Sequence, residues 1–196
     1  MIKVGYVPEK ISDQIYEILC RDNTFPWFYQ EHTSKYNGNA EVLQLNGYEE
    51  HPYFAHIILT DNQIQSNAYD IVFNDLWQWL IRNEPDIDFD ELIRVRAAKV
   101  TKDFVPPTQP HVDSPLPHYV LIYYVNNSDG ATAIYKETYD GTPPDKVTPK
   151  QYIDPEKGKY VIFDGLRYHS GNAPMFHKDR TILNINYYGQ SRVLSS

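Results

Sequence analysis

The hydrophobic pattern in the first half of the chain changes between helical and extended stretches. Apolar residues recur at helical spacing at residues 8–22 and again at 67–80, so we predict a helix in each range. Extended segments are predicted from aromatic or apolar runs at residues 25–30, 41–45 and 54–59. Because both helices fall in the first half, we expect them to pack outside the sheets as a scaffold.

The second half is dominated by short β-branched and aromatic runs separated by turn residues. These runs predict strands at residues 92–100, 119–125, 131–135, 160–163 and 180–188. The segment 139–158 is rich in Asp, Pro, Lys and Gly, so we predict an exposed loop there. Short strands without intervening helices favour an antiparallel double sheet or a barrel. The predicted fold class is therefore mainly β with flanking α-helices.

Composition narrows the class of protein. The chain has 196 residues, of which 41% are hydrophobic and 22% are charged, and this predicts one globular domain. Within that domain, residues 1–90 are expected to form the helical scaffold and outer strands. Residues 91–190 are expected to form the strand-rich core.

Charge and cysteine usage limit the expected partners and compartment. The net charge of −8 argues against a nucleic-acid partner, because neutralising phosphates needs clustered Lys and Arg. No apolar run is long enough to span a bilayer, and residues 1–8 lack the apolar core of a signal peptide. The single cysteine, Cys20, excludes an internal disulfide and fits a reducing compartment. We therefore expect a cytoplasmic protein that binds neither nucleic acid nor a membrane.

His111 and Asp113 flank a single residue and form a candidate metal site. On a strand, residues two apart point to the same face, so an imidazole nitrogen and a carboxylate oxygen would converge on one point. Such pairs also occur by chance, and a third ligand is needed to raise the interpretation above coincidence. His169 follows the strand that ends near Asp164, and it completes a two-His-one-carboxylate set. That set suits non-haem Fe(II) and leaves coordination positions open.

Arg180 begins the last predicted strand, whose other residues are largely apolar. An arginine in such a strand needs a reason, and its planar guanidinium suits a carboxylate held through two hydrogen bonds.

These residues, in this order, resemble the signature of the Fe(II)- and 2-oxoglutarate-dependent dioxygenases, and specifically the prolyl-4-hydroxylase-like branch. Three further stretches resemble segments of that family: residues 121–126, 129–135 and 158–169. Asp129 departs from the family pattern, because it stands where the first glycine of a Gly-Gly-x-Thr turn is usual. The resemblance covers roughly residues 92–188.

The resemblance implies a double-stranded β-helix, also called a cupin-like jelly roll, with iron at one mouth. It implies that Fe(II) is bound by His111, Asp113 and His169. The cosubstrate 2-oxoglutarate would chelate the iron and place its far carboxylate against Arg180. Tyr124 is expected to supply a hydroxyl partner, and Asn184 shares the strand face of Arg180, so it is expected to face the same cavity. With O2, such an enzyme would hydroxylate a C–H of a peptide or small molecule and release succinate and CO2.

Two other interpretations stay open at this point. One is a jelly-roll binding or structural protein without activity, and the other is a cupin-type metalloenzyme of different chemistry. The presence of all three metal ligands together with Arg180 counts against both. The substrate cannot be read from the sequence, because the aromatic residues at 25–29 fit either core packing or a pocket wall.

Overall fold

The computed structural model describes residues 2–31, 52–102 and 109–189. The helical segments of this part are α1 (Glu9–Tyr16), η1 (Glu17–Arg21), η3 (Ile71–Trp77) and α2 (Gln78–Asn83). The strands are β1 (Ile2–Tyr6), β2 (Phe28–Gln30), β3 (Tyr53–Thr60), β4 (Gln63–Ile64), β5 (Leu92–Thr101), β6 (Tyr119–Tyr124), β7 (Thr132–Thr138), β8 (Pro149–Ile153), β9 (Lys159–Asp164), β10 (Arg167–Gly171) and β11 (Asp179–Tyr187).

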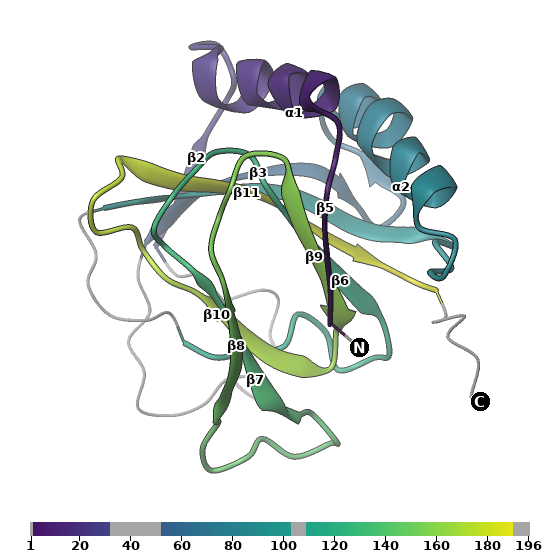
Figure 1. Ribbon diagram of the computed structural model, residues 1–196, viewed down its shortest axis with the longest axis vertical. Helices are drawn as coiled ribbons and strands as arrows, with labels where there is room; N and C mark the ends of the chain where they lie inside the picture. Colours follow the sequence, from purple (N-terminus) through teal and green to yellow (C-terminus); the bar gives the residue numbers. More distant parts are fainter. Residues whose placement is uncertain (1, 32–51, 103–108, 190–196) are drawn as a thin grey trace.

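The strands form two antiparallel sheets. The larger sheet has the order β1-β9-β6-β11-β5-β3-β2, with β4 paired to β3, and the smaller has the order β10-β7-β8. Figure 1 shows α1 and α2 side by side over one face of the larger sheet, with the smaller sheet on the opposite side. The predicted scaffold of helices outside the sheets is therefore confirmed.

The helices bury one apolar stripe each against the larger sheet. Ile15 and Leu19, four residues apart, are buried in the first helical run. Val72, Leu76 and Leu80 repeat the same spacing in the second. These stripes are the periodic residues that predict the helices in the sequence.

The larger sheet separates two hydrophobic cores, as β11 illustrates. Leu183 packs into the core shared with the helices, whereas Ile182 packs into the core between the two sheets. Because residues two apart on a strand share a face, Arg180 and Asn184 point the same way as Ile182, toward the space between the sheets. Arg180 and Asn184 therefore face that space.

The fold differs from the sequence prediction in several places. The segment 139–158 is not a structureless loop, because β8 pairs with β7; four of its five residues are exposed, so this edge strand has no alternating apolar pattern. The strands β1, β4 and β10 were not predicted. Of the aromatic residues at 25–29, Phe25 and Trp27 pack against the core shared with the helices, whereas Phe28 and Tyr29 are 57% and 62% exposed, so core packing explains only the first two. The strand predicted at 41–45 lies outside the described residues.

In the three described ranges, no helix has the length and apolar character needed to cross a membrane.

Candidate active site

The backbone around His111 is anchored directly to the strand that carries His169. The His111 N–H donates to the His169 carbonyl and the His169 N–H donates to the His111 carbonyl, each over 3.0 Å. Val112 packs with Ala133 and Tyr168 in a separate apolar cluster. This isolated bridge, rather than a continuous strand, gives His111 and Asp113 a common direction.

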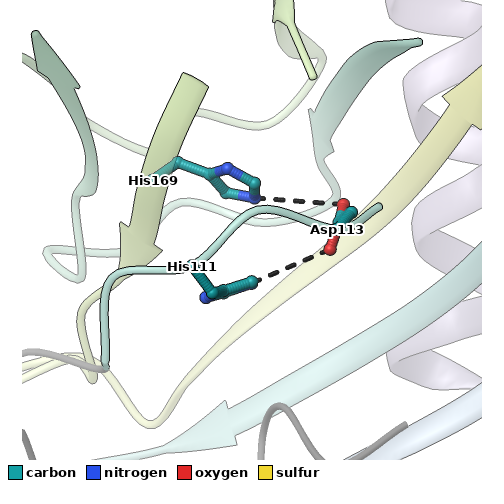
Figure 2. A group of neighbouring side chains, drawn as sticks. All are labelled: His111, Asp113 and His169. Carbon is teal, nitrogen blue, oxygen red and sulfur yellow. Dashed lines mark ion pairs between the residues drawn. The ribbon is translucent and has the colours of Figure 1, made fainter. Parts of the chain in front are cut away.

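The three predicted ligands converge on one point. The candidate ligand atoms of His111, Asp113 and His169 all lie within 4.8 Å of one another. The Asp113 carboxylate lies 3.7 Å from His111 Nε2 through Oδ1 and 3.9 Å from His169 Nε2 through Oδ2. Figure 2 shows the two imidazoles and the carboxylate facing one another across a small gap. The sequence spacing thus predicted a real cluster.

Backbone carbonyls fix the orientation of both imidazole rings. His111 Nδ1 lies 2.9 Å from the Gln109 carbonyl, and His169 Nδ1 lies 3.1 Å from the Arg167 carbonyl. Because a carbonyl oxygen accepts hydrogen bonds only, each Nδ1 carries the proton and donates it. In the neutral ring with this proton position, Nε2 carries the lone pair and faces the cluster, as a metal-binding imidazole requires.

His169 has the electronic state that a metal ligand needs. Burial, together with the neighbouring His111, lowers the pKa of His169 to about 4, so its ring is neutral at pH 7. Its Nε2 is buried and has no hydrogen-bond partner. A buried lone pair without a partner is costly, and a metal ion at this position would satisfy it.

Asp113 is held as a carboxylate by three side chains that the sequence analysis did not connect to it. Arg94 Nη2 lies 3.1 Å from Oδ1, while Asn184 Nδ2 and Asn186 Nδ2 donate to Oδ2 over 3.1 Å and 2.8 Å. Burial alone would raise the pKa of Asp113, but the positive charge of Arg94, with the two histidines, holds it well below its usual range. The carboxylate is therefore ionised and fixed in orientation.

The donor set fits a divalent transition metal. Two imidazole nitrogens and one carboxylate oxygen form the facial set typical of non-haem Fe(II). The unpartnered lone pair of His169 and the hydrogen bonds that orient all three ligands support this fit.

A cavity of about 540 Å3, part of it open to solvent, extends from this cluster between the two sheets. At the cluster it is lined by His111, His169 and Asn184, and farther along by Thr132 and Arg180. Its walls are completed by Tyr53, Arg96, Ala98, Val100, Ile122, Ser170, Gly171 and Ile182. The cavity therefore joins the candidate metal ligands to Arg180, as the sequence resemblance implied.

Arg180 is buried at the far end of this cavity. Its Nη2 donates to Thr132 Oγ1 over 2.7 Å, and its Nε has no hydrogen-bond partner. Gly171 makes room for the guanidinium, since a Cβ there would lie 2.9 Å from Arg180 Nη1. Arg180 is thus a buried cation with unused donor capacity beside a cavity, the condition for binding an anion.

Tyr124 and Asn184 lie in different relations to the cavity. The Tyr124 hydroxyl donates to Thr132 Oγ1 over 2.7 Å, and its ring lies 5.8 Å from the Arg180 guanidinium carbon. Asn184 lines the cavity and also orients Asp113. Their contacts with a cosubstrate stay predictions.

Sequence reasoning missed Arg94, Asn186 and Thr132 at this site. The available signal was strand alternation: Asn186 is two residues beyond Asn184, and Arg94 interrupts an apolar strand as Arg180 does.

Asp129 organises the loop that leads to Arg180. Its carboxylate accepts hydrogen bonds from the backbone N–H groups of Met175, Phe176 and His177 over 2.9, 2.9 and 3.1 Å, and lies 2.9 Å from His177 Nδ1. Although partial burial opposes ionisation, these contacts lower the pKa of Asp129. These hydrogen bonds explain why Asp129 stands where the family pattern has a glycine.

Replacing Asp129 with asparagine is expected to destabilise the protein by about 1–3 kcal/mol at pH 7, because the amide has one acceptor oxygen instead of two. The folded-state pKa is lowered, so this contribution is present above pH 3.8, the ordinary pKa of Asp, and is lost as the pH falls below it. Urea unfolding of both proteins at pH 7 and near pH 3 measures the difference. An equal difference at both pH values would contradict this account.

Comparison with solved structures identifies the fold. A prolyl hydroxylase from Trichoplax adhaerens, in complex with a hypoxia inducible factor peptide fragment, matches 100% of this chain and 87% of its own, with 14% identity and a TM-score of 0.58. A prolyl-4-hydroxylase from Pseudomonas putida matches 95% and 91%, with 12% identity and a TM-score of 0.57. The α-ketoglutarate-dependent epimerase SnoN of nogalamycin biosynthesis matches 95% and 77%, with 10% identity and a TM-score of 0.60.

Sequence comparison adds no closer relative. No protein-family model matches the chain, and no curated protein matches it. The structural matches, at 10–14% identity, establish architecture. The predicted fold class is confirmed: the chain has the double-stranded β-helix, or jelly-roll, fold of the Fe(II)- and 2-oxoglutarate-dependent oxygenases.

Proposed function

We propose that this protein is an Fe(II)- and 2-oxoglutarate-dependent oxygenase that hydroxylates a C–H of its substrate. One observation carries the proposal: a single cavity joins the cluster of His111, Asp113 and His169 to the buried Arg180. The reaction converts 2-oxoglutarate, O2 and the substrate R–H into succinate, CO2 and R–OH. Bound Fe(II), together with 2-oxoglutarate, supplies the oxidising chemistry.

The side chains of the chain have separate tasks in this reaction. His111 and His169 direct their Nε2 atoms toward the metal position, because their Nδ1 protons are donated to backbone carbonyls. Asn186 and Arg94 hold the Asp113 carboxylate ionised and oriented.

The walls of the cavity position the cosubstrate. Arg180 neutralises the far carboxylate of 2-oxoglutarate, and Thr132 holds the guanidinium in place. Ile122 and Ile182 present apolar surface between the two ends, which limits water around the reacting groups.

Iron-dependent formation of succinate tests this proposal. Purified protein incubated with Fe(II), ascorbate, 2-oxoglutarate and air is expected to form succinate and CO2, slowly without substrate and faster with it. Zn(II) in place of Fe(II) is the control, because zinc has no redox chemistry and is expected to give none. A jelly-roll protein without activity and a cupin-type metalloenzyme of other chemistry would both fail to form succinate. That outcome, with a broad set of candidate substrates present, would contradict the proposal.

The substrate is proposed to be a peptide or a small molecule. The structural neighbours include a hydroxylase bound to a peptide and an epimerase of nogalamycin biosynthesis, so their names support both kinds.

A further inference from the structure

We infer that Arg96, together with Tyr53, recognises a carboxylate group of the substrate. This inference rests on the proposed function and names the chemistry of the substrate that such an enzyme accepts. Arg96 would then be a second cationic position in the cavity, separate from the one that Arg180 provides.

Arg96 lies beside the candidate metal cluster. On β5 it is paired with Asn184 of β11, the residue that donates to Asp113. Arg180 is paired with Val100, four residues along the same two strands, which corresponds to about 13 Å. The two arginines therefore belong to different parts of the cavity that both of them line.

Tyr53 holds the Arg96 guanidinium against the cavity wall. Arg96 Nη1 donates to the Tyr53 hydroxyl over 3.0 Å, and the guanidinium carbon lies 5.5 Å from the centre of the Tyr53 ring. Tyr53 is buried and lines the same cavity. The guanidinium is thus preorganised by a hydrogen bond and a cation–π contact.

Arg96 forms no salt bridge with an acidic side chain in the part of the chain that the structure describes, although its charge helps to lower the pKa of Asp113. Arg96 Nε is buried and has no hydrogen-bond partner. Asp113 forms its close ion pair with Arg94 instead. No Asp or Glu is among the described residues that line the cavity, whereas two arginines are. A partly buried cation with an unused donor favours an anionic ligand.

The far carboxylate of 2-oxoglutarate would neutralise Arg180. A second anion is needed to neutralise Arg96. The position beside the metal cluster is where the reacting part of the substrate must come. A carboxylate held by the planar guanidinium would fix the distance between the bound group and the C–H that reacts. The substrate is therefore a carboxylic acid, either as a free small acid or as the terminal carboxylate of a peptide.

Pairs of probes that differ only in this charge test the inference. The protein, loaded without O2 with Mn(II) and 2-oxoglutarate, is titrated with N-acetyl amino acids and their C-terminal amides, and with short peptides carrying a free or amidated C-terminus. We expect carboxylates to bind more tightly than the matching amides. A larger preference among the N-acetyl amino acids identifies a free small acid as the substrate. A larger preference among the peptides identifies the terminal carboxylate of a peptide.

The Arg96→Gln variant is expected to weaken binding of the carboxylate probes by about 10- to 100-fold and to leave the affinity for 2-oxoglutarate unchanged. Arg96→Lys keeps the charge but not the planar fork, so it is expected to recover part of the affinity. Arg82→Gln, which removes one exposed positive charge on α2, is the matched control and is expected to bind like the wild type. Thermal unfolding establishes that each variant is folded.

Two results would overturn the inference. One is equal binding of every carboxylate and its amide to the wild type. The other is a loss of 2-oxoglutarate affinity in Arg96→Gln as large as its loss of affinity for the carboxylate probes, which would place Arg96 in the cosubstrate site. Titration of the same probes into protein loaded with Mn(II) but without 2-oxoglutarate separates the two proposals. Failure of 2-oxoglutarate itself to bind the wild type contradicts the proposed function. A carboxylate preference that the wild type shows and Arg96→Gln loses still supports the role of Arg96.

Discussion

Asp113→Ala is expected to abolish Fe(II) binding and, with it, the turnover of 2-oxoglutarate. The substitution removes the only carboxylate of the ligand set and leaves the positive charge of Arg94 facing the site. We expect the iron affinity to fall by more than the 10- to 100-fold that the loss of a group supporting a ligand typically costs. Iron titration without O2 and an assay for succinate measure the two effects.

A control variant and a second ligand variant accompany this prediction. Asp145→Ala removes an exposed carboxylate from a loop and is expected to change neither quantity. His111→Ala removes a ligand that is less buried than Asp113 and does not disturb the contacts of Arg94, so it is expected to give the same loss in a protein with near-normal thermal stability. Succinate formation at the wild-type rate in either ligand variant would refute the assignment of the metal site.

Arg180→Gln is expected to weaken 2-oxoglutarate binding by about 100-fold while leaving Fe(II) binding intact. Arg180 is 4% exposed and is the only cation at its end of the cavity among the described lining residues. Loss of two charge-assisted hydrogen bonds to a carboxylate accounts for an effect of this size. Titration of the Mn(II)-loaded protein with 2-oxoglutarate measures it.

A cosubstrate analogue isolates the role of the charge. 2-Oxobutyrate keeps the 2-oxo acid group but lacks the far carboxylate, so it is expected to bind the wild type and Arg180→Gln with similar affinity. Arg82→Gln again serves as the matched control for the loss of a positive charge. If 2-oxoglutarate bound Arg180→Gln as tightly as the wild type, Arg180 would not hold the cosubstrate carboxylate.

The sequence predicted those parts of the site that depend on local pattern. His111 and Asp113 are two residues apart, and this spacing gave their side chains a common direction even though the backbone forms only an isolated bridge. Strand alternation placed Arg180 and Asn184 on one face of the last strand, and β11 places them there. These relations need only neighbouring residues and a known strand geometry.

The parts that the sequence did not predict depend on contacts between distant segments. Arg94 and Asn186 reach Asp113 because β5 and β11 are paired in one particular register, and a single sequence does not contain that register. Arg96 illustrates the same limit, because the pairing of β5 with β11 directs its side chain into the cavity. The edge strand β8 was missed because its exposed residues have no apolar alternation.

The measurement that tests the central claim most directly is a crystal structure of the protein with Mn(II), as a redox-inert substitute for Fe(II), and 2-oxoglutarate, grown without O2. The account predicts metal density bound by His111 Nε2, Asp113 and His169 Nε2, with 2-oxoglutarate extending from the metal to Arg180. A metal bound elsewhere, or a cosubstrate whose far carboxylate does not meet Arg180, would contradict it.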